Sequence, residues 1–394
     1  MYIAILGRQP ELSIAEIERV YGQESITPIS PQAALVDSPA FDVNLLGGTQ
    51  KAGRVVFETD KSDWPRLSKK IAQHCVDDWS NVESKITLGI SAYGFDIDPR
   101  IVQKTGIIIK QILRKRGVSL RLIPNSQMAL NTAASHHNKL GLTPNKQEIL
   151  VVRTNGGKAF VAESIGAQNI SAYAARDQKR PKRDARVGML PPKLAQIMIN
   201  LAVGTADVDT SPAGPTILDP FCGTGVILQE AALMGYSVYG TDSSEKMIRY
   251  SRDNINWLAD LYKTKLNWYL HEGDATDMKW RQPINAVVSE AYLGQPFNSP
   301  PSSVKLAEVR GDCNLIITKF LKNIATQIPA GTPLCLAVPA WRGDTGRLTH
   351  LPLIDDLQKL GFKRHEFKNA SNHKLIYFRE DQVVARELLV LTRS

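Results

Sequence analysis

The sequence has no closely spaced cysteines, no long apolar run and no histidine cluster. Its four cysteines, Cys75, Cys222, Cys313 and Cys335, form no C-x-x-C pair, which argues against a zinc finger or a disulfide framework and indicates reduced thiols. No stretch approaches the roughly 20 apolar residues that a membrane span needs, and the start of the chain lacks the pattern of a signal peptide. The seven histidines show no metal-binding spacing. We therefore expect a cytoplasmic protein with no metal and no membrane attachment.

Positive charge is concentrated in one part of the 394-residue chain, whose net charge is +9. Lys and Arg number 10 against 14 Asp and Glu in residues 1–100, 17 against 4 in 101–200, and 21 against 21 in 201–394. A localised basic patch suits a nucleic-acid backbone, because each neutralised phosphate releases condensed counterions. A solvated surface without a partner is the alternative. The candidate RNA-contacting residues are Arg114, Lys115, Arg116, Arg176, Lys179, Arg180, Lys182 and Arg183.

The first 166 residues contain patterns typical of two small α+β modules. The first has strands near residues 1–6, 33–37 and 54–57 and a helix that begins at Ser13, with Glu16 completing a capping box. The second has a strand, a helix with apolar residues at helical spacing, and a hairpin around a Gly-Gly turn. These elements are expected at residues 85–91, 100–116 and 148–163. The basic stretch from 168 to 187 lacks periodicity and predicts an exposed linker.

From residue 189 onward, strands alternate with helices. A helix is expected at residues 192–202, and the βα units that follow indicate a parallel, doubly wound sheet. The closing hairpin of residues 374–378 and 387–391 predicts one antiparallel strand at the edge of that sheet.

A cofactor site is predicted where these strands end. Asp219-Pro-Phe-Cys-Gly-Thr-Gly225 follows a buried strand, and Gly223 and Gly225 would let the backbone approach a ligand. Asp242 ends the next strand, where a carboxylate can accept both ribose hydroxyls. A glycine loop followed by an acid at the end of the next strand also fits a dinucleotide site. However, this loop is not G-x-G-x-x-G, and Asp219 would repel a pyrophosphate. S-adenosylmethionine, which has no phosphate and carries an amino group and a sulfonium, fits better.

Further candidates for cofactor binding surround these two acids. Asp274 follows the third strand and could accept a hydrogen bond from an adenine amino group, although an ordinary acidic turn is the alternative. Lys193 could meet the cofactor carboxylate or equally face solvent. The remaining cofactor candidates are Pro220, Ser243 and Ala275.

The fourth strand of this domain suggests a catalytic position. It ends in Glu290-Ala-Tyr-Leu-Gly294, which places an acid and an aromatic ring at the same sheet edge. Glu290 could accept a hydrogen bond from an exocyclic amine, and Tyr292 could stack on its ring. A helix N-cap or a surface acid is an equally good interpretation of Glu290.

These motifs, in this order, resemble the THUMP-containing tRNA guanosine N2-methyltransferases, which modify guanosine 10. The similar segments are Met1–Glu16, Tyr173–Asp184, residues 188–202 and Asp219–Gly225. The resemblance implies an α/β fold, in which a Rossmann-like methyltransferase domain follows ferredoxin-like and THUMP domains. The implied divisions are a ferredoxin-like subdomain at 1–60, a THUMP RNA-binding domain at 61–166, a basic linker at 167–188 and a methyltransferase domain at 189–394.

One departure from the family pattern affects the expected chemistry. Family members have D-P-P-Y-G where this chain has Glu290-Ala-Tyr-Leu-Gly294, so both stiffening prolines are missing. From the cofactor motifs and the resemblance, the leading hypothesis is an S-adenosylmethionine-dependent tRNA guanine-N2 methyltransferase. Two alternatives stay open, a catalytically idle tRNA-binding protein of the same fold and a methyltransferase with another amine target. The sequence leaves the oligomeric state open, with a monomer as one option.

Overall fold

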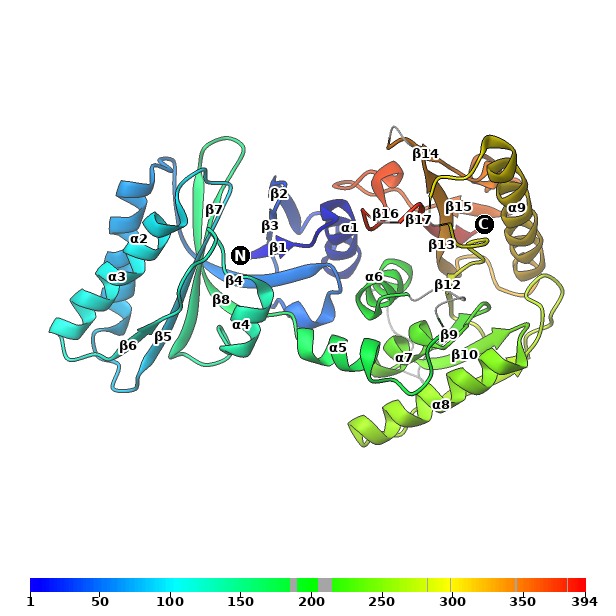
Figure 1. Cartoon of the computed structure of the whole chain (residues 1–394), viewed down its shortest axis with the longest axis horizontal. Coiled ribbons are helices and arrows are strands. Elements are labelled where there is room, and N and C mark those ends of the chain that lie inside the picture. Colours follow the sequence, from blue (N-terminus) through cyan, green and yellow to red (C-terminus); the bar gives the residue numbers. More distant parts are fainter. Residues whose placement is uncertain (185–189, 205–214, 282, 298, 344–345, 381) are drawn as a thin grey trace. The chain divides into compact units, whose positions relative to one another are not determined.

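The computed structural model describes residues 1–184, 190–204, 215–281, 283–297, 299–343, 346–380 and 382–394 (Figure 1). The chain forms two compact units. Unit 1 comprises Met1–Ile14 and Glu24–Ala172, and unit 2 comprises Ala15–Gln23 and Tyr173–Ser394. The chain passes between the units inside helix α1 (Pro10–Tyr21), again between Gln23 and Glu24, and finally between Ala172 and Tyr173, within the stretch expected to be a basic linker. No helix in the described part of the chain is long and apolar enough to cross a membrane.

Unit 1 contains one eight-stranded sheet in the order β2-β3-β1-β4-β8-β7-β5-β6. Its strands are β1 (Tyr2–Leu6), β2 (Ile26–Ser30), β3 (Ala33–Val36), β4 (Thr49–Thr59), β5 (Ile86–Tyr93), β6 (Leu120–Leu122), β7 (Lys146–Arg153) and β8 (Ala159–Ala167). Strand β4 pairs with β1 on one side and with β8 on the other. The two modules expected from the sequence therefore share one continuous sheet, and the boundary expected at residue 60 does not separate two sheets.

The helices of unit 1 are the start of α1, α2 (Trp64–Trp79), α3 (Pro99–Lys115) and α4 (Thr132–His137), with a short 3-10 helix, η1 (Val43–Leu45). Helices α2 and α3 lie side by side against one face of the sheet (Figure 1), and their apolar side chains form one core with β5, β7 and β8. Helix α1 starts three residues earlier than expected. Ser13 is therefore not its N-cap, because the Ser13 hydroxyl donates to the carbonyl of Gly48 (2.7 Å) from inside the helix.

A buried ion pair ties the strands of unit 1 together. The Lys51 ammonium on β4 donates to Glu148 Oε1 on β7 (2.5 Å) and to the carbonyl of Leu130 (2.6 Å), and both charged side chains are about 1% exposed. The Ser91 hydroxyl on β5 donates to the same carboxylate oxygen (2.5 Å). Burial lowers the pKa of Lys51. Because each group depends on the other for its hydrogen bonds, removing one leaves a buried charge uncompensated.

We expect Lys51→Met to destabilise unit 1 by about 3–5 kcal/mol, since Glu148 would remain buried without its cation. Urea unfolding followed by tryptophan fluorescence measures this loss. The matched control is Lys158→Met, which breaks a far more exposed pair between the same two halves of the sheet (Lys158 to Glu58, 2.7 Å) and should cost less than about 1 kcal/mol. Equal losses in the two variants would contradict the role given to the buried pair.

Unit 2 contains a mixed sheet whose main path is β11-β10-β9-β12-β13-β17-β15. The strands are β9 (Thr216–Asp219), β10 (Ser237–Asp242), β11 (Trp268–Glu272), β12 (Ala286–Glu290), β13 (Pro333–Arg342), β14 (Leu348–Thr349), β15 (Phe362–Arg364), β16 (Ile376–Tyr377) and β17 (Val384–Arg393). The first five strands of the path are parallel. The chain order reverses between β9 and β12, which is where ligands bind in sheets of this kind.

The antiparallel strand of unit 2 does not lie at the sheet edge, as the sequence had suggested. Strand β17 lies between β13 and the short strand β15. Phe362 of β15 pairs opposite Arg393 of β17. The expected hairpin does form between β16 and β17. Strand β15 was missed because three residues are too few to show an alternating pattern.

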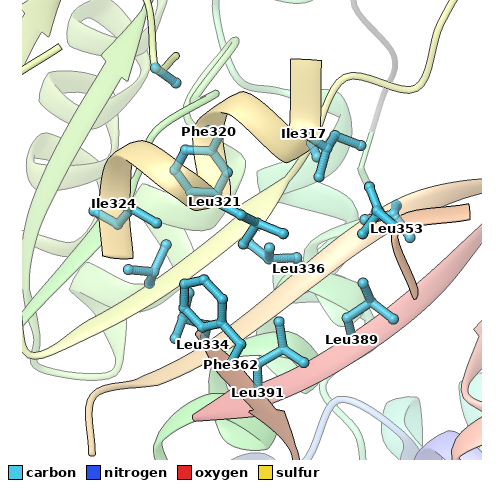
Figure 2. Close-up of a cluster of buried hydrophobic side chains, with 14 of the residues drawn as sticks. Ile317, Phe320, Leu321, Ile324, Leu334, Leu336, Leu353, Phe362, Leu389 and Leu391 are labelled. Carbon is cyan, nitrogen blue, oxygen red and sulfur yellow. The ribbon is translucent and has the colours of Figure 1, made fainter. Parts of the chain in front are cut away.

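The helices of unit 2 are the later part of α1, the greater part of α5 (Ile170–Gln178), α6 (Pro192–Val203), α7 (Val226–Leu233), α8 (Glu245–Tyr262) and α9 (Ser303–Ala325). Short 3-10 helices, η2 (Pro352–Asp356) and η3 (Asn372–Lys374), also belong to this unit. Figure 2 shows the core between α9 and the sheet. Ile317, Phe320, Leu321 and Ile324, spaced for one helical face, pack against leucines of β13 and β17.

The stretch expected to be an exposed basic linker is helical in its first half, where α5 runs to Gln178. The expectation is wrong there, because Tyr173 and Arg176 are buried. The Arg176 guanidinium makes a bidentate pair with Glu230 of α7 (2.6 and 2.9 Å). Residues 185–189, and with them the expected domain boundary at 188 and 189, lie outside the described residues.

Candidate functional site

The loop between β9 and α7 needs glycine at two places. Gly223 and Gly225 have φ angles of 51° and 80°, which favour glycine, and a Cβ at Gly225 would lie 2.8 Å from the hydroxyl oxygen of Ser251. The Gly223 N–H donates to Asp242 Oδ2 (3.0 Å), so the loop is fixed to the end of β10. The loop lies close against both α8 and β10 and has positive φ angles at both glycines. A larger residue at either position would therefore strain the backbone.

A cavity of about 490 Å³ opens at the carboxyl ends of β9, β10 and β12. The structure brings six of the predicted site residues into its lining, namely Asp219, Gly223, Asp242, Ser243, Glu290 and Tyr292. Acidic side chains therefore outnumber basic ones in the lining of this cavity, which suits a ligand that carries positive charge.

Asp219 is almost completely buried at the base of the cavity. Its Oδ1 accepts hydrogen bonds from the Ser289 hydroxyl (2.6 Å) and from the Phe221 N–H (3.3 Å). Burial raises the pKa of Asp219 to about 8. A cation entering the cavity would favour the charged form of this carboxyl group.

Asp242 is held in a fixed orientation by two backbone N–H groups. Gly223 donates to Oδ2 (3.0 Å) and Ser244, at the start of α8, donates to Oδ1 (2.9 Å). Burial raises its pKa. Each carboxylate oxygen can accept more than one hydrogen bond, so the group can still bind two hydroxyls of a ligand.

Five of the predicted cofactor residues do not line this cavity: Pro220, Gly225, Asp274, Ala275 and Lys193. Pro220 and Gly225 belong to the loop itself. The exposed Asp274 carboxylate instead accepts from the Thr276 N–H (2.8 Å), as in an ordinary acidic turn. Ala275 is buried, and the Lys193 ammonium lies over the ring of Tyr173, 5.3 Å from its centroid.

Glu290 ends β12 and forms an ion pair with Arg386, a buried residue of β17. Glu290 is not a helix N-cap, since the next helix, α9, is capped by Ser302. Tyr292 lines the same cavity and is 45% exposed, so its ring is accessible. Gly294 closes this loop with a φ of 80°, where a Cβ would lie 2.7 Å from Val309. The acid and the aromatic ring therefore share one wall of the cavity, as expected.

Three charged residues at the site were missed from the sequence. The first is Arg386. The other two, Asp184 and Lys246, line the cavity and form an ion pair with each other (2.7 Å). Asp184 reaches the cavity because the Asn254 side chain of α8 bonds both the N–H (2.9 Å) and the carbonyl (3.0 Å) of Lys182. An acid inside a basic run was the only local signal.

The candidate RNA-contacting residues separate into exposed and buried groups. Arg176 and Arg180 are only 9% and 3% exposed. Neither therefore presents its guanidinium to a phosphate, contrary to the expectation from the sequence. Arg176 is occupied by Glu230. Lys182 is partly buried, with its ammonium 3.6 Å from Asp253. The exposed members of the set are Arg114, Lys115, Arg116, Lys179 and Arg183.

The chain is similar to known methyltransferases. Residues 180–309 match the UPF0020 family, described as RMKL-like, methyltransferase domain. Over 165 residues the chain is 30% identical to the tRNA (guanine(10)-N2)-dimethyltransferase of Methanothermobacter thermautotrophicus, a match that covers 42% of each chain. Over 235 residues it is 27% identical to the enzyme of the same description from Methanocaldococcus jannaschii, covering 58% of this chain and 62% of that one. The matched part thus spans less than two thirds of either relative.

Two solved structures share the fold over almost the whole chain. The structure of TrmN from Thermus thermophilus has a TM-score of 0.54 at 16% identity, covering 100% of this chain and 99% of that one. A possible methylase from Clostridium difficile 630 has a TM-score of 0.52 at 12% identity, covering 98% and 97%. The α/β Rossmann-like methyltransferase fold expected for unit 2 is confirmed.

The raised pKa of Asp219 makes stability depend on pH. The unfolded chain releases this proton near the ordinary pKa of 3.8, whereas the folded chain keeps it until about pH 8. The group therefore costs no stability below pH 4, costs progressively more as the pH rises, and reaches its full cost above pH 8. We expect Asp219→Asn, which keeps an oxygen to accept from Ser289, to remove this part of the pH dependence.

Urea unfolding at pH 5 and pH 8.5 measures the effect. The gain in stability of the variant over the parent protein should be clearly larger at pH 8.5 than at pH 5. The same difference between the two proteins at both pH values would show that Asp219 is not the responsible group.

Proposed function

We propose that this chain is an S-adenosylmethionine-dependent methyltransferase that transfers a methyl group to the exocyclic N2 of a guanosine in tRNA. The observation that carries the proposal is the convergence of Asp219, Asp242 and Glu290 on one cavity at the reversal point of the sheet. The substrate is inferred from the two relatives described above, which are named tRNA (guanine(10)-N2)-dimethyltransferases.

The residues of the cavity suit this cofactor, which supplies an electrophilic methyl group on a sulfonium when it is bound. Asp242, oriented by two backbone N–H groups, would accept the ribose hydroxyls. Asp219 and Asp184 would balance the positive charges of the ligand. The exposed Asp274 has no part in this proposal.

Glu290 and Tyr292 would handle the base. Tyr292, exposed on the wall of the cavity, offers a face on which a guanine ring can stack. Glu290 would accept a hydrogen bond from the exocyclic amine and thereby aim its nitrogen at the methyl group. Such a transfer needs in-line positioning of the nitrogen and the loss of one proton from it, and the Glu290 carboxylate in the cavity wall would accept that proton.

Arg386 would be a positioning residue that acts through Glu290. The family's D-P-P-Y-G loop is stiffened by two prolines that this chain lacks. Here the Arg386 Nε–H bonds one carboxylate oxygen of Glu290, and the Ala291 N–H donates to the carbonyl of Ala337 (3.0 Å). We infer that the ion pair replaces the prolines by fixing the acid and leaving its second oxygen for the amine.

Unit 1 would hold the tRNA. We propose that it contains the ferredoxin-like and THUMP modules implied by the resemblance, built here on one sheet. Arg114, Lys115 and Arg116 are exposed where α3 ends and would contact the phosphate backbone.

Incubation of the protein with bulk tRNA and methyl-labelled cofactor, followed by nucleoside mass spectrometry, tests the function. We expect N2-methylated guanosine with the parent protein and none with Asp242→Ala, whose cofactor affinity should fall at least tenfold by calorimetry. Cofactor and tRNA binding without turnover would favour the idle tRNA-binding protein. Preference for duplex DNA over tRNA in competition would favour another amine target.

The role of Arg386 predicts a specific kinetic pattern. Arg386→Met should lower kcat on the order of a hundredfold, because a misplaced acceptor costs about that much, while KM for tRNA and the affinity for the cofactor stay within about threefold. Arg386→Lys should recover part of the rate, since it restores a cation beside Glu290. A loss confined to cofactor binding, or an unchanged kcat, would contradict this role.

A further inference from the structure

Three side chains that can bind a metal converge in unit 1, whereas the residues that line the cavity described above all belong to unit 2. His74 and Asp78 lie one turn apart on α2, and Glu163 lies on β8. His74 Nε2 is 3.1 Å from Glu163 Oε1 and 3.6 Å from Asp78 Oδ2, and the three atoms all lie within 4.8 Å of one another. Part of each side chain remains exposed, so an ion could reach all three from solvent.

These distances match a tetrahedral zinc site. With bonds of about 2.0–2.1 Å to nitrogen and oxygen, neighbouring ligand atoms around Zn²⁺ lie about 3.3–3.4 Å apart. The two distances from His74 Nε2 bracket that value. A flexible carboxylate can close the third edge by a small rotation, and water can fill the fourth position.

The charges around the three side chains also favour a cation. In the described part of the chain, Asp78 and Glu163 have no Lys or Arg within ion-pair distance, and their only ion pairs are with His74. Asp77, the neighbour of Asp78, adds a third acid and is bonded by the neutral amide of Gln73. Two ligand carboxylates facing one imidazole therefore leave negative charge that a divalent ion would balance.

The framework holds the three ligands in place. Helix α2 is anchored by the buried Leu67, Ile71 and Cys75, and the His74 ring contacts the Phe57 ring edge-on, with centroids 5.9 Å apart. Glu163 sits in the middle of the sheet, paired opposite Arg54 and Ile149. Little ordering would be needed for binding.

We propose that His74, Asp78 and Glu163 form a divalent transition-metal site, with Zn²⁺ as the favoured ion. One imidazole and two carboxylates suit Zn²⁺, whereas Ca²⁺ and Mg²⁺ prefer oxygen ligands alone. The bound ion links α2 to β8 and stabilises unit 1. The site does not depend on the methyltransferase function, and it is an alternative to the sequence-based expectation that the protein binds no metal.

Calorimetric titration of the chelator-treated full chain with ZnCl2 at pH 7 tests this site. We expect saturable binding of one equivalent and a rise in Tm with zinc concentration, because the folded state binds the ion. His74→Ala, and independently Asp78→Asn on the exposed side of α2, should weaken binding at least tenfold. No rise in Tm and no saturable binding by the parent protein would overturn the proposal.

His137→Ala is the matched control, because His137 is an exposed histidine of the same unit that lies outside the cluster. It should leave zinc affinity unchanged. Equal affinity in the parent, His74→Ala and Asp78→Asn proteins would also overturn the proposal. Circular dichroism of the zinc-free variants checks that each remains folded.

Discussion

The candidate site in unit 2 depends on one constraint, that parallel strands place their carboxyl ends at the same edge of a sheet. Asp219 and Asp242 end adjacent strands, and Glu290 ends the strand on the other side of β9. The reversal of chain order between β9 and β12 leaves a space there, because the connections from the two halves leave on opposite faces. Several carboxyl groups line the resulting cavity. Burial makes ionisation of Asp219 unfavourable, and a cation bound in the cavity would offset that cost.

The antiparallel strand β17 adds what the parallel strands do not. It lies beside β13 and brings Arg386 within reach of Glu290, 96 residues away in sequence. A guanidinium in this position restrains the acid of the Glu290–Gly294 segment, which contains no proline. The same strand presents Glu387 to His350 and Arg364, so consecutive residues of β17 form ion pairs on separate partners. Fixing a charged group from another strand of the sheet is an alternative to stiffening the loop that carries it.

Unit 1 illustrates the same principle in its interior and at its surface. Lys51 and Glu148 join β4 to β7 across the boundary expected between two modules. At the surface, His74 and Glu163 join α2 to β8. In each case a polar contact connects elements that local sequence patterns assign separately. Backbone pairing of β4 with β8 makes the eight strands a single sheet, and the buried ion pair adds a side-chain contact across it.

The sequence alone determined the strands and helices with strong periodicity, the glycine loop at Asp219–Gly225 and the acids at the ends of β9, β10 and β12. These features are local, since strand alternation, glycine at positive φ and a carboxylate after a strand each leave a mark within a few residues. Tertiary structure alone decided that Arg176 is buried against Glu230, that Asp184 reaches the cavity, and that Asp274 and Lys193 stay outside it. It also decided the contacts of Arg386 and His74. Their partners lie tens of residues away, and the free energy of such a contact depends on a distance in space that no local pattern of residues records.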